Sequence, residues 1–201
     1  MPPPIIAYHV VFSAYGFWLP NDPRGSWSEK VWAPNLVRFG PPIPAATRRS
    51  VAAAPHDATL RLAAKAALLY PPVYFDAPQI ECIAKGIGDE VRKYDLPVYA
   101  AALMPDHVHM VFARKAQKAE AWVGYFKRAA SRLLRELGLH PFAERPRDDG
   151  SLPTPWAEGG WRVYLHADEE VIRTIRYIEE NPINAGLPRQ QWDFVTTYSP
   201  A

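Results

Sequence analysis

Short runs of β-branched and aromatic residues alternate along the chain with longer amphipathic segments, and the short runs predict four β-strands. They cover about residues 8–13, 97–103, 107–113 and 161–165. In the third run Val108, Met110 and Phe112 share one side of an extended strand. His107 and His109 then share the other side. A Pro-Asp pair between the second and third runs predicts a turn, so we expect these two strands to form an antiparallel hairpin.

Three longer segments repeat their apolar residues at a period near 3.6 and predict helices with one buried face. They cover about residues 76–94, 117–137 and 168–181, and a shorter helical pattern covers 59–69. Gly138 suits the C-terminal cap of the second helix. In the third helix Tyr177 lies about 210° from the centre of the apolar stripe, so packing against the core does not use it. Asn181 shares the face of Tyr177, and Pro182 is expected to stop the helix.

The order of these elements predicts the fold class. It is strand, helix, strand, strand, helix, strand and then an extra helix, which is the order of the ferredoxin-like split βαβ fold. We therefore expect an α+β protein with an antiparallel sheet, helices on one face of it, and a C-terminal helix that carries Tyr177. The 201 residues fit a single domain, residues 1–201, with a Pro-rich loop insertion at about 28–56.

The composition excludes several classes of protein. An apolar fraction of 48% and a charged fraction of 22% are those of a globular protein with a sizeable core. A single cysteine, Cys82, rules out an internal disulfide and fits a reducing cytoplasm. The N-terminus has no signal-peptide pattern, and no segment approaches the ~18 apolar residues that span a membrane. We therefore expect a cytoplasmic protein that has no membrane partner.

Positive charge is concentrated in one region of the chain. Residues 114–147 hold nine Lys or Arg residues against three Glu, although the net charge of the whole chain is only +2. Arg128, Arg132 and Arg135 lie within about 60° of one another on the second long helix. This cluster is either a phosphate-facing patch or an ordinary solvated helix face. Residues 15–27 hold several aromatic side chains, which either cap the edge of a core or stack on exposed bases.

The histidine strand and the third helix together offer a catalytic chemistry. His107 and His109 are about 6.6 Å apart on one face, so their imidazoles can converge on one metal ion. Asn181 offers a carbonyl oxygen as a further ligand, and Tyr177 offers a nucleophilic hydroxyl. A metal ion that polarises a phosphate beside a positioned tyrosine makes a phosphoryl-transfer site. The other histidines carry no spacing signal and are interpreted as structural or surface residues: His9, His56, His140 and His166.

Two motifs resemble those of a known family. Residues 104–109, Met-Pro-Asp-His-Val-His, resemble the HUH motif of the single-tyrosine transposases, specifically the REP-associated tyrosine transposase branch. Residues 177–187 resemble the tyrosine helix of that branch with its Asn-Pro ending, and residues 15–25 resemble its first-strand loop. Asn181 stands where other members carry glutamine, and both side chains offer an amide oxygen. The resemblance spans roughly residues 8–195.

The resemblance implies a metal-dependent DNA transposase or endonuclease that nicks and rejoins single-stranded hairpin DNA. Tyr177 would attack a DNA phosphate, form a 5′-phosphotyrosine link and free a 3′-OH. His107, His109 and Asn181 would hold Mg²⁺ or Mn²⁺, whereas the ligand types alone favour zinc or manganese. The implied partners are single-stranded or hairpin DNA and a second copy in a homodimer, in a cytoplasmic, nucleoid-associated protein. The residues expected to bind DNA are Trp18, Arg24, Lys127, Arg128, Arg132 and Arg135.

Two other functions stay open for this sequence. The first is a DNA-hairpin-binding regulator of the same fold that has no turnover. The second is a metal-dependent phosphodiesterase that uses water as the nucleophile, with Tyr177 only as a positioning group. The sequence favours the transposase, because the histidine pair and the tyrosine are both present.

Overall fold

Four strands form one antiparallel sheet in the computed structural model of the chain, which describes residues 3–17, 19, 31, 34–41 and 57–200. The strands are β1 (Ala7–Ser13), β2 (Val98–Leu103), β3 (His107–Ala113) and β4 (Trp161–Leu165). Their order in the sheet is β2-β3-β1-β4, and every neighbouring pair is antiparallel. This order is that of the ferredoxin-like split βαβ fold, so the predicted α+β fold class is confirmed.

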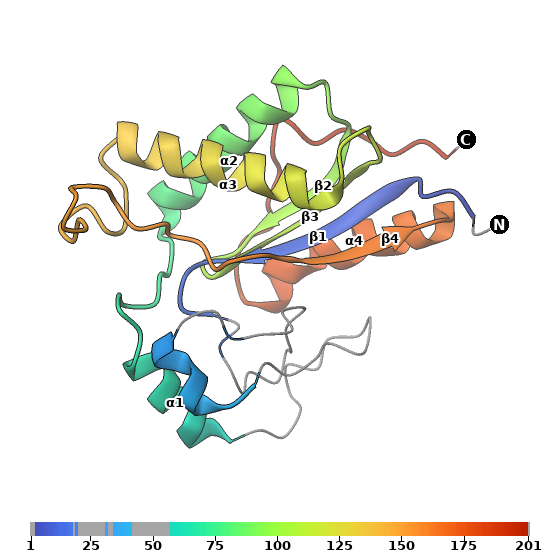
Figure 1. Cartoon of the computed structure of the whole chain (residues 1–201). Helices are drawn as coiled ribbons and strands as arrows, with labels where there is room; N and C mark the ends of the chain where they lie inside the picture. Colours follow the sequence, from blue (N-terminus) through green and yellow to red (C-terminus); the bar gives the residue numbers. More distant parts are fainter. Residues whose placement is uncertain (1–2, 18, 20–30, 32–33, 42–56, 201) are drawn as a thin grey trace.

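Helices cover both faces of this sheet (Figure 1). The crossover helices α2 (Ala77–Lys93) and α3 (Ala119–Glu136) pack side by side on one face, as predicted. The additional helix α4 (Asp168–Asn184) lies against the opposite face, where it contacts β2 and β3. A short helix, α1 (Ala58–Ala66), and a 3-10 helix, η1 (Pro34–Phe39), lie between β1 and α2 in the sequence and pack on each other. Apart from residues 31 and 34–41, the Pro-rich stretch at 28–56 lies outside the described residues.

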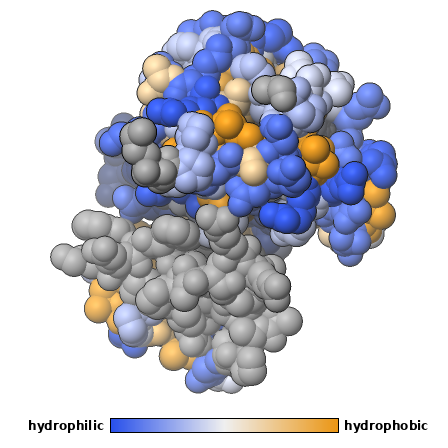
Figure 2. All heavy atoms as spheres, turned by 90° about the vertical axis from the view of Figure 1, so that its right-hand side faces the viewer, coloured by the Kyte–Doolittle hydropathy of each residue, from blue (hydrophilic) through white to orange (hydrophobic). Residues whose placement is uncertain are grey.

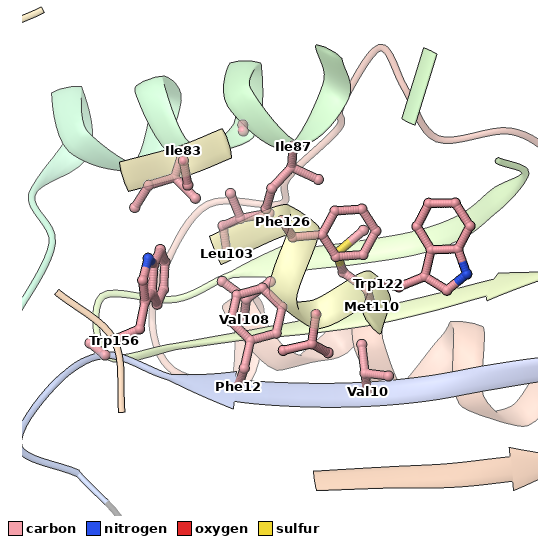
Figure 3. Packing of buried hydrophobic residues seen from close by; sticks show 14 of the residues in the cluster. Val10, Phe12, Ile83, Ile87, Leu103, Val108, Met110, Trp122, Phe126 and Trp156 are labelled. Atoms are coloured by element: carbon pink, nitrogen blue, oxygen red, sulfur yellow. The ribbon is translucent and has the colours of Figure 1, made fainter. Parts of the chain in front are cut away.

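The alternation of side chains along the strands divides the core into two layers. Val10 and Phe12 of β1, with Val108 and Met110 of β3, face α2 and α3. Figure 3 shows these side chains meeting large residues of the helices, including Ile83, Ile87, Trp122 and Phe126. The opposite face carries smaller residues, Ala7, Ala100, Ala102 and Val111, and α4 buries Val171 and Ile178 against them. The prediction that Val108, Met110 and Phe112 lie on one side of the strand, and His107 and His109 on the other, is therefore correct.

The C-terminal end of α4 differs from the prediction. Pro182 does not stop the helix, because α4 continues to Asn184. A proline removes only its own amide donor, and in a last turn few later hydrogen bonds depend on it. The helix ends instead at Gly186, whose φ of 74° lies in the left-handed region. The amides of Gly186 and Leu187 reach back to the carbonyls of Ile183 and Pro182 at 2.9 and 2.8 Å, which is the Schellman pattern.

The face of the protein drawn in Figure 2 is mainly polar where it is coloured. Figure 2 shows hydrophilic residues over most of the coloured face, with hydrophobic residues in small separate patches. Among the described residues, none of the helices combines the length and the apolarity that crossing a bilayer requires.

Candidate active site

Strand β3 places two histidines under helix α4. His107 opens the strand and His109 follows two residues later, so both rings lie on the face that α4 covers. Their ring centroids are 4.8 Å apart and the planes are nearly perpendicular. His109 is buried, whereas about a fifth of the His107 side chain is exposed. One imidazole is thus held inside the protein, and the other opens toward solvent.

The turn before β3 supplies a partner for His107. The Nδ1 atom of His107 lies 2.6 Å from the Oδ1 atom of Asp106. An ionised carboxylate only accepts hydrogen bonds, so Nδ1 carries a proton, and in the neutral form of the ring the lone pair is on Nε2. A carboxylate behind a histidine is the usual support of a metal-ligating imidazole, because it fixes the tautomer and raises the basicity of the ligand.

A third histidine lies buried beside the pair. His9 of β1 was expected to be structural or at the surface. In the sheet β1 lies beside β3, and the Nε2 atom of His9 is 3.3 Å from the Nδ1 atom of His109. The sequence has no short-range signal for this contact, since 100 residues separate the two histidines. Only the antiparallel pairing of β1 with β3, which puts His9 on the same face as His109, could have indicated it.

Burial keeps these two imidazoles neutral. Loss of solvent lowers the pKa of His9 from 6.5 to about 4. Loss of solvent, followed by the neighbouring His107 and His9, lowers the pKa of His109 well below its ordinary value. A neutral imidazole has a lone pair, so His109 is available as a metal ligand at neutral pH without first losing a proton.

Helix α4 brings Tyr177 to the histidines of its own chain. Val171 and Ile178 anchor the helix by their full burial, and Tyr177 on another face keeps 44% of its surface exposed. The tyrosine ring centroid lies 5.7 Å from that of His109 and 6.2 Å from that of His9. The predicted separation of Tyr177 from the packing stripe is therefore correct. Its ring stands beside the histidines and is open to solvent.

Asn181 lies one turn further along α4. Its Nδ2 atom donates to the carbonyl of Tyr177 at 3.0 Å, as an amide nitrogen must. The Oδ1 atom is therefore the part of this side chain that is left to bind another group. Within the described residues, no three His, Cys, Asp or Glu side chains gather in a way that could hold a metal ion. The ligand set expected from the sequence, His107, His109 and Asn181, therefore stays a prediction.

The arginines predicted to bind DNA lie elsewhere. Arg128, Arg132 and Arg135 are exposed on α3 and line an open groove of about 840 Å³, which we call the basic groove. Lys93 and Arg147 also line it, and Glu90 is the acidic residue among its lining side chains. Because α3 and α4 cover opposite faces of the sheet, the basic groove and Tyr177 are on opposite faces too.

Aromatic residues form part of the basic groove. The guanidinium of Arg128 lies 5.0 Å from the ring centroid of Tyr125. The Tyr125 ring in turn stacks on Tyr94 at 5.5 Å between centroids. A cation next to a stacked pair of tyrosines combines the two features that single-stranded nucleic acids bind, a phosphate partner and a flat apolar ring.

Lys127 makes contacts that differ from those of the arginines. Its Nζ atom donates to the backbone carbonyls of Ala157 and Gly159, at 2.7 and 2.5 Å. Burial lowers the pKa of Lys127 to about 8, so the side chain is still mostly protonated at neutral pH. Its charge is directed at the loop before β4. Two further residues predicted to bind DNA, Trp18 and Arg24, lie outside the described residues.

The wall of the basic groove meets the histidine strand at one end of the sheet. Trp156, which lines the groove, pairs with Ala14 directly after β1. The amide of Ala14 donates to the carbonyl of Asp106 at 2.8 Å. Asp106 is the residue that holds His107. Three backbone segments joined by hydrogen bonds thus connect the groove to the candidate metal ligands around the end of the sheet.

No protein-family model matches the sequence, and no curated protein matches it. Among solved structures, the chain is similar to a REP-associated tyrosine transposase bound to a REP hairpin. The TM-score is 0.47 and the identity 10%, over 94% of this chain and 73% of that one. It is also similar to a candidate transposase from Deinococcus radiodurans R1, with a TM-score of 0.36 and 15% identity over 88% of this chain and 91% of that one.

Proposed function

We propose that this protein is a DNA transposase or endonuclease of the HUH single-tyrosine type, which nicks and rejoins single-stranded hairpin DNA. The observation that carries the proposal is the position of Tyr177. The exposed ring of this residue lies 5.7 Å from that of His109, and His109 in turn lies beside the carboxylate-supported His107. Two of the three segments that resemble the transposase family, the histidine motif and the tyrosine helix, thus meet in space.

In the proposed reaction, the Tyr177 hydroxyl oxygen attacks the phosphorus of a DNA phosphodiester. The bond from phosphorus to the 3′ oxygen breaks, the phenol proton is lost to solvent, and the 3′ oxygen leaves as a hydroxyl after taking up a proton. The 5′ phosphate stays on the tyrosine. A phenol is a better leaving group than a sugar hydroxyl because its pKa is lower, about 10, so a 3′-OH can later attack the link and rejoin the strand.

The proposed cofactor is a divalent ion, Mg²⁺ or Mn²⁺. When bound, it supplies positive charge at the scissile phosphate. His107 through Nε2, His109 and the Oδ1 atom of Asn181 would hold it. Asp106 keeps His107 in the tautomer that can bind, and Val171 and Ile178 hold the helix that aims Tyr177.

The basic groove is the proposed binding surface for the rest of the DNA. Arg128, Arg132 and Arg135 would contact phosphates, and Tyr125 would stack on an unpaired base. Since the groove and Tyr177 are on opposite faces of the sheet, the bound strand would pass the end of the sheet at Trp156. This route suits DNA with a folded stem and a single-stranded continuation. The proposed setting is the nucleoid in the cytoplasm, and the homodimer stays a prediction that light scattering of the purified chain would test.

The test uses single-stranded hairpin oligonucleotides from the flanks of the gene, incubated with the protein and Mn²⁺ or Mg²⁺. A denaturing gel then detects a covalent protein–DNA adduct. We expect the adduct with the wild type and its loss in both Tyr177→Phe and His107→Ala. Tyr164→Phe is the matched control, since Tyr164 is also an exposed tyrosine but lies on β4, and it should keep the adduct.

Two results would overturn the proposal. Cleavage without an adduct that survives in Tyr177→Phe would make the protein a phosphodiesterase that uses water. Binding of the hairpins with no cleavage by the wild type would make it a regulator.

A further inference from the structure

We propose that His9 is the positioning residue of the candidate metal ligand His109: its Nε2 atom accepts the Nδ1–H of His109 and leaves the Nε2 atom of His109 free to bind. The inference rests on the proposed function, in which His109 is a ligand. The two nitrogens are 3.3 Å apart, and the two rings lie nearly parallel, at 25°. Both residues are buried, with 6% and 7% of their surfaces exposed.

A hydrogen bond between the Nε2 atom of His9 and the Nδ1 atom of His109 needs one proton, which either His9 or His109 can donate. If His9 donates, the Nδ1 atom of His109 is the acceptor and the proton of the neutral His109 ring is on Nε2. That nitrogen then has no lone pair, and His109 cannot bind a metal ion through it. If His109 donates, its Nε2 atom has the lone pair. Only the second arrangement is compatible with a ligand role through Nε2.

The same contact has one rival reading. A metal ion sits about 2 Å from a ligating imidazole nitrogen, so two nitrogens that bind one ion at a tetrahedral angle are also about 3.3 Å apart. The Nε2 atom of His9 and the Nδ1 atom of His109 are at this distance. In that arrangement His9 would itself be a ligand, and its replacement by glutamine would lower the affinity as much as its replacement by phenylalanine.

The two histidines of β3 are thus supported in the same way from different sides. Asp106 holds the Nδ1–H of His107, and His9 holds the Nδ1–H of His109. The difference follows from burial. Asp106 and His107 keep about a quarter and a fifth of their side chains exposed, so a carboxylate is tolerated there. An ionised carboxylate at the buried position of His9 would lose its hydration, so a neutral acceptor is the stable choice.

The position of His9 is itself fixed. The residue lies in the middle of β1, opposite Val111 of β3 on one side and Val163 of β4 on the other. Trp161 approaches its ring edge to face, with 5.0 Å between centroids. A ring held by two neighbouring strands and an indole cannot turn away from His109 without disturbing the sheet.

The first experiment reads the tautomer directly. Long-range ¹H–¹⁵N correlation spectra of the metal-free full chain distinguish a protonated Nδ1 from a protonated Nε2. We expect His109 of the wild type to be protonated at Nδ1 and His9 to have a free Nε2. A proton on the Nε2 atom of His109 would overturn the proposal. This measurement does not depend on catalysis or on a metal ion.

The second experiment measures the affinity for Mn²⁺ by calorimetry. His9→Phe keeps an aromatic ring but removes the acceptor, and we expect the affinity to fall 10- to 100-fold. His9→Gln places an amide oxygen near the position of Nε2 and should stay within about threefold of the wild type. His140→Gln is the matched control, since His140 is also buried but lies directly after α3, and it should bind Mn²⁺ like the wild type.

The outcomes separate this inference from the proposed function. Equal affinities in His9→Phe and His9→Gln, with wild-type binding intact, would overturn only the role of His9. A wild type that binds no Mn²⁺ would overturn the metal site, and with it the proposed function, whatever the tautomer of His109. If His9→Phe does not fold, the spectrum of the wild type and the affinity of His9→Gln still decide the question.

Discussion

The Nδ1 atom of His107 lies 2.6 Å from the carboxylate of Asp106, its neighbour in the sequence. The two residues end a turn and begin a strand, so the turn itself aims the carboxylate at the ring. The same turn carries the carbonyl of Asp106 to the amide of Ala14, which joins it to β1. One short segment thus holds a candidate metal ligand and fixes the end of the sheet.

This relationship predicts an effect of Asp106 on metal binding. Asp106→Ala removes the acceptor of the Nδ1–H, and we expect the affinity for Mn²⁺ to fall 10- to 100-fold. Asp106→Asn keeps a neutral acceptor and should lie between this variant and the wild type. Titration calorimetry measures the affinity, with Asp89→Asn as a surface control. An Asp106→Ala protein that binds Mn²⁺ like the wild type would show that the carboxylate does not support the ligand.

The basic groove predicts how DNA binding depends on salt. Arg128→Ala, Arg132→Ala and Arg135→Ala should each weaken binding of hairpin DNA. Each should also reduce the slope of log affinity against log salt by about 1, because one phosphate contact is lost. Filter binding over a range of NaCl concentrations measures the slope. Arg92→Ala is the control, since Arg92 is exposed on α2 but does not line the groove, and it pairs with Asp89 and Asp193 at 2.9 and 3.1 Å. Unchanged slopes in all three groove variants would exclude the groove as a phosphate-binding surface.

Lys127 should behave differently from the arginines on the same helix. Lys127→Met keeps most of the aliphatic chain but removes the hydrogen bonds to the carbonyls of Ala157 and Gly159. We expect the free energy of unfolding to fall by about 1–3 kcal/mol, because two backbone carbonyls, one of them half-buried, lose a charged donor. The salt slope of DNA binding should stay within about 0.3 of the wild type. Urea unfolding and filter binding test the two parts, and a slope reduced by a full unit would place Lys127 among the DNA contacts.

The end of α4 predicts a backbone effect at Gly186. Its φ is 74°, and no atom lies within 4 Å of the position that a Cβ atom would take, so a side chain here meets strain but no clash. Gly186→Ala should cost about 1 kcal/mol of unfolding free energy. Gly186→Asn should cost less, since asparagine tolerates this conformation better. The two variants are compared by urea unfolding, and equal costs would argue against a purely conformational cause.

The buried histidines predict sensitivity to acid. The pKa of His9 is about 4 in the folded protein, against 6.5 as its ordinary value. The unfolded chain therefore binds a proton between pH 6.5 and 4 that the folded chain does not, so stability falls as the pH drops through this window. Between pH 7 and 5 we expect His9 to account for a loss of about 2 kcal/mol in the metal-free protein. Urea unfolding at both pH values should show a smaller loss in His9→Gln, and an equal loss in both proteins would contradict this assignment.

The local sequence pattern was sufficient to predict the helices and strands, and the face of its element on which each candidate residue lies. Alternation along residues 107–113 predicted which side chains of β3 enter the core, because successive residues of a strand point to opposite sides. Helical geometry likewise predicted that Tyr177 and Asn181 leave the buried stripe of α4. Local rules also failed in one place. They predicted that the helix stops at Pro182, but the helix continues past this residue to the cap at Gly186.

The sequence by itself therefore determined the fold class, the pair His107 and His109, and the helix that bears Tyr177. The tertiary structure alone decided that His9 joins the pair and that the arginines of α3 lie across the sheet from Tyr177. The physical reason is that the sequence pattern is local, whereas the contacts of the site join residues far apart in the sequence. Periodicity reports which side of an element is buried, whereas contacts between residues 100 positions apart depend on which strands pair and in which register.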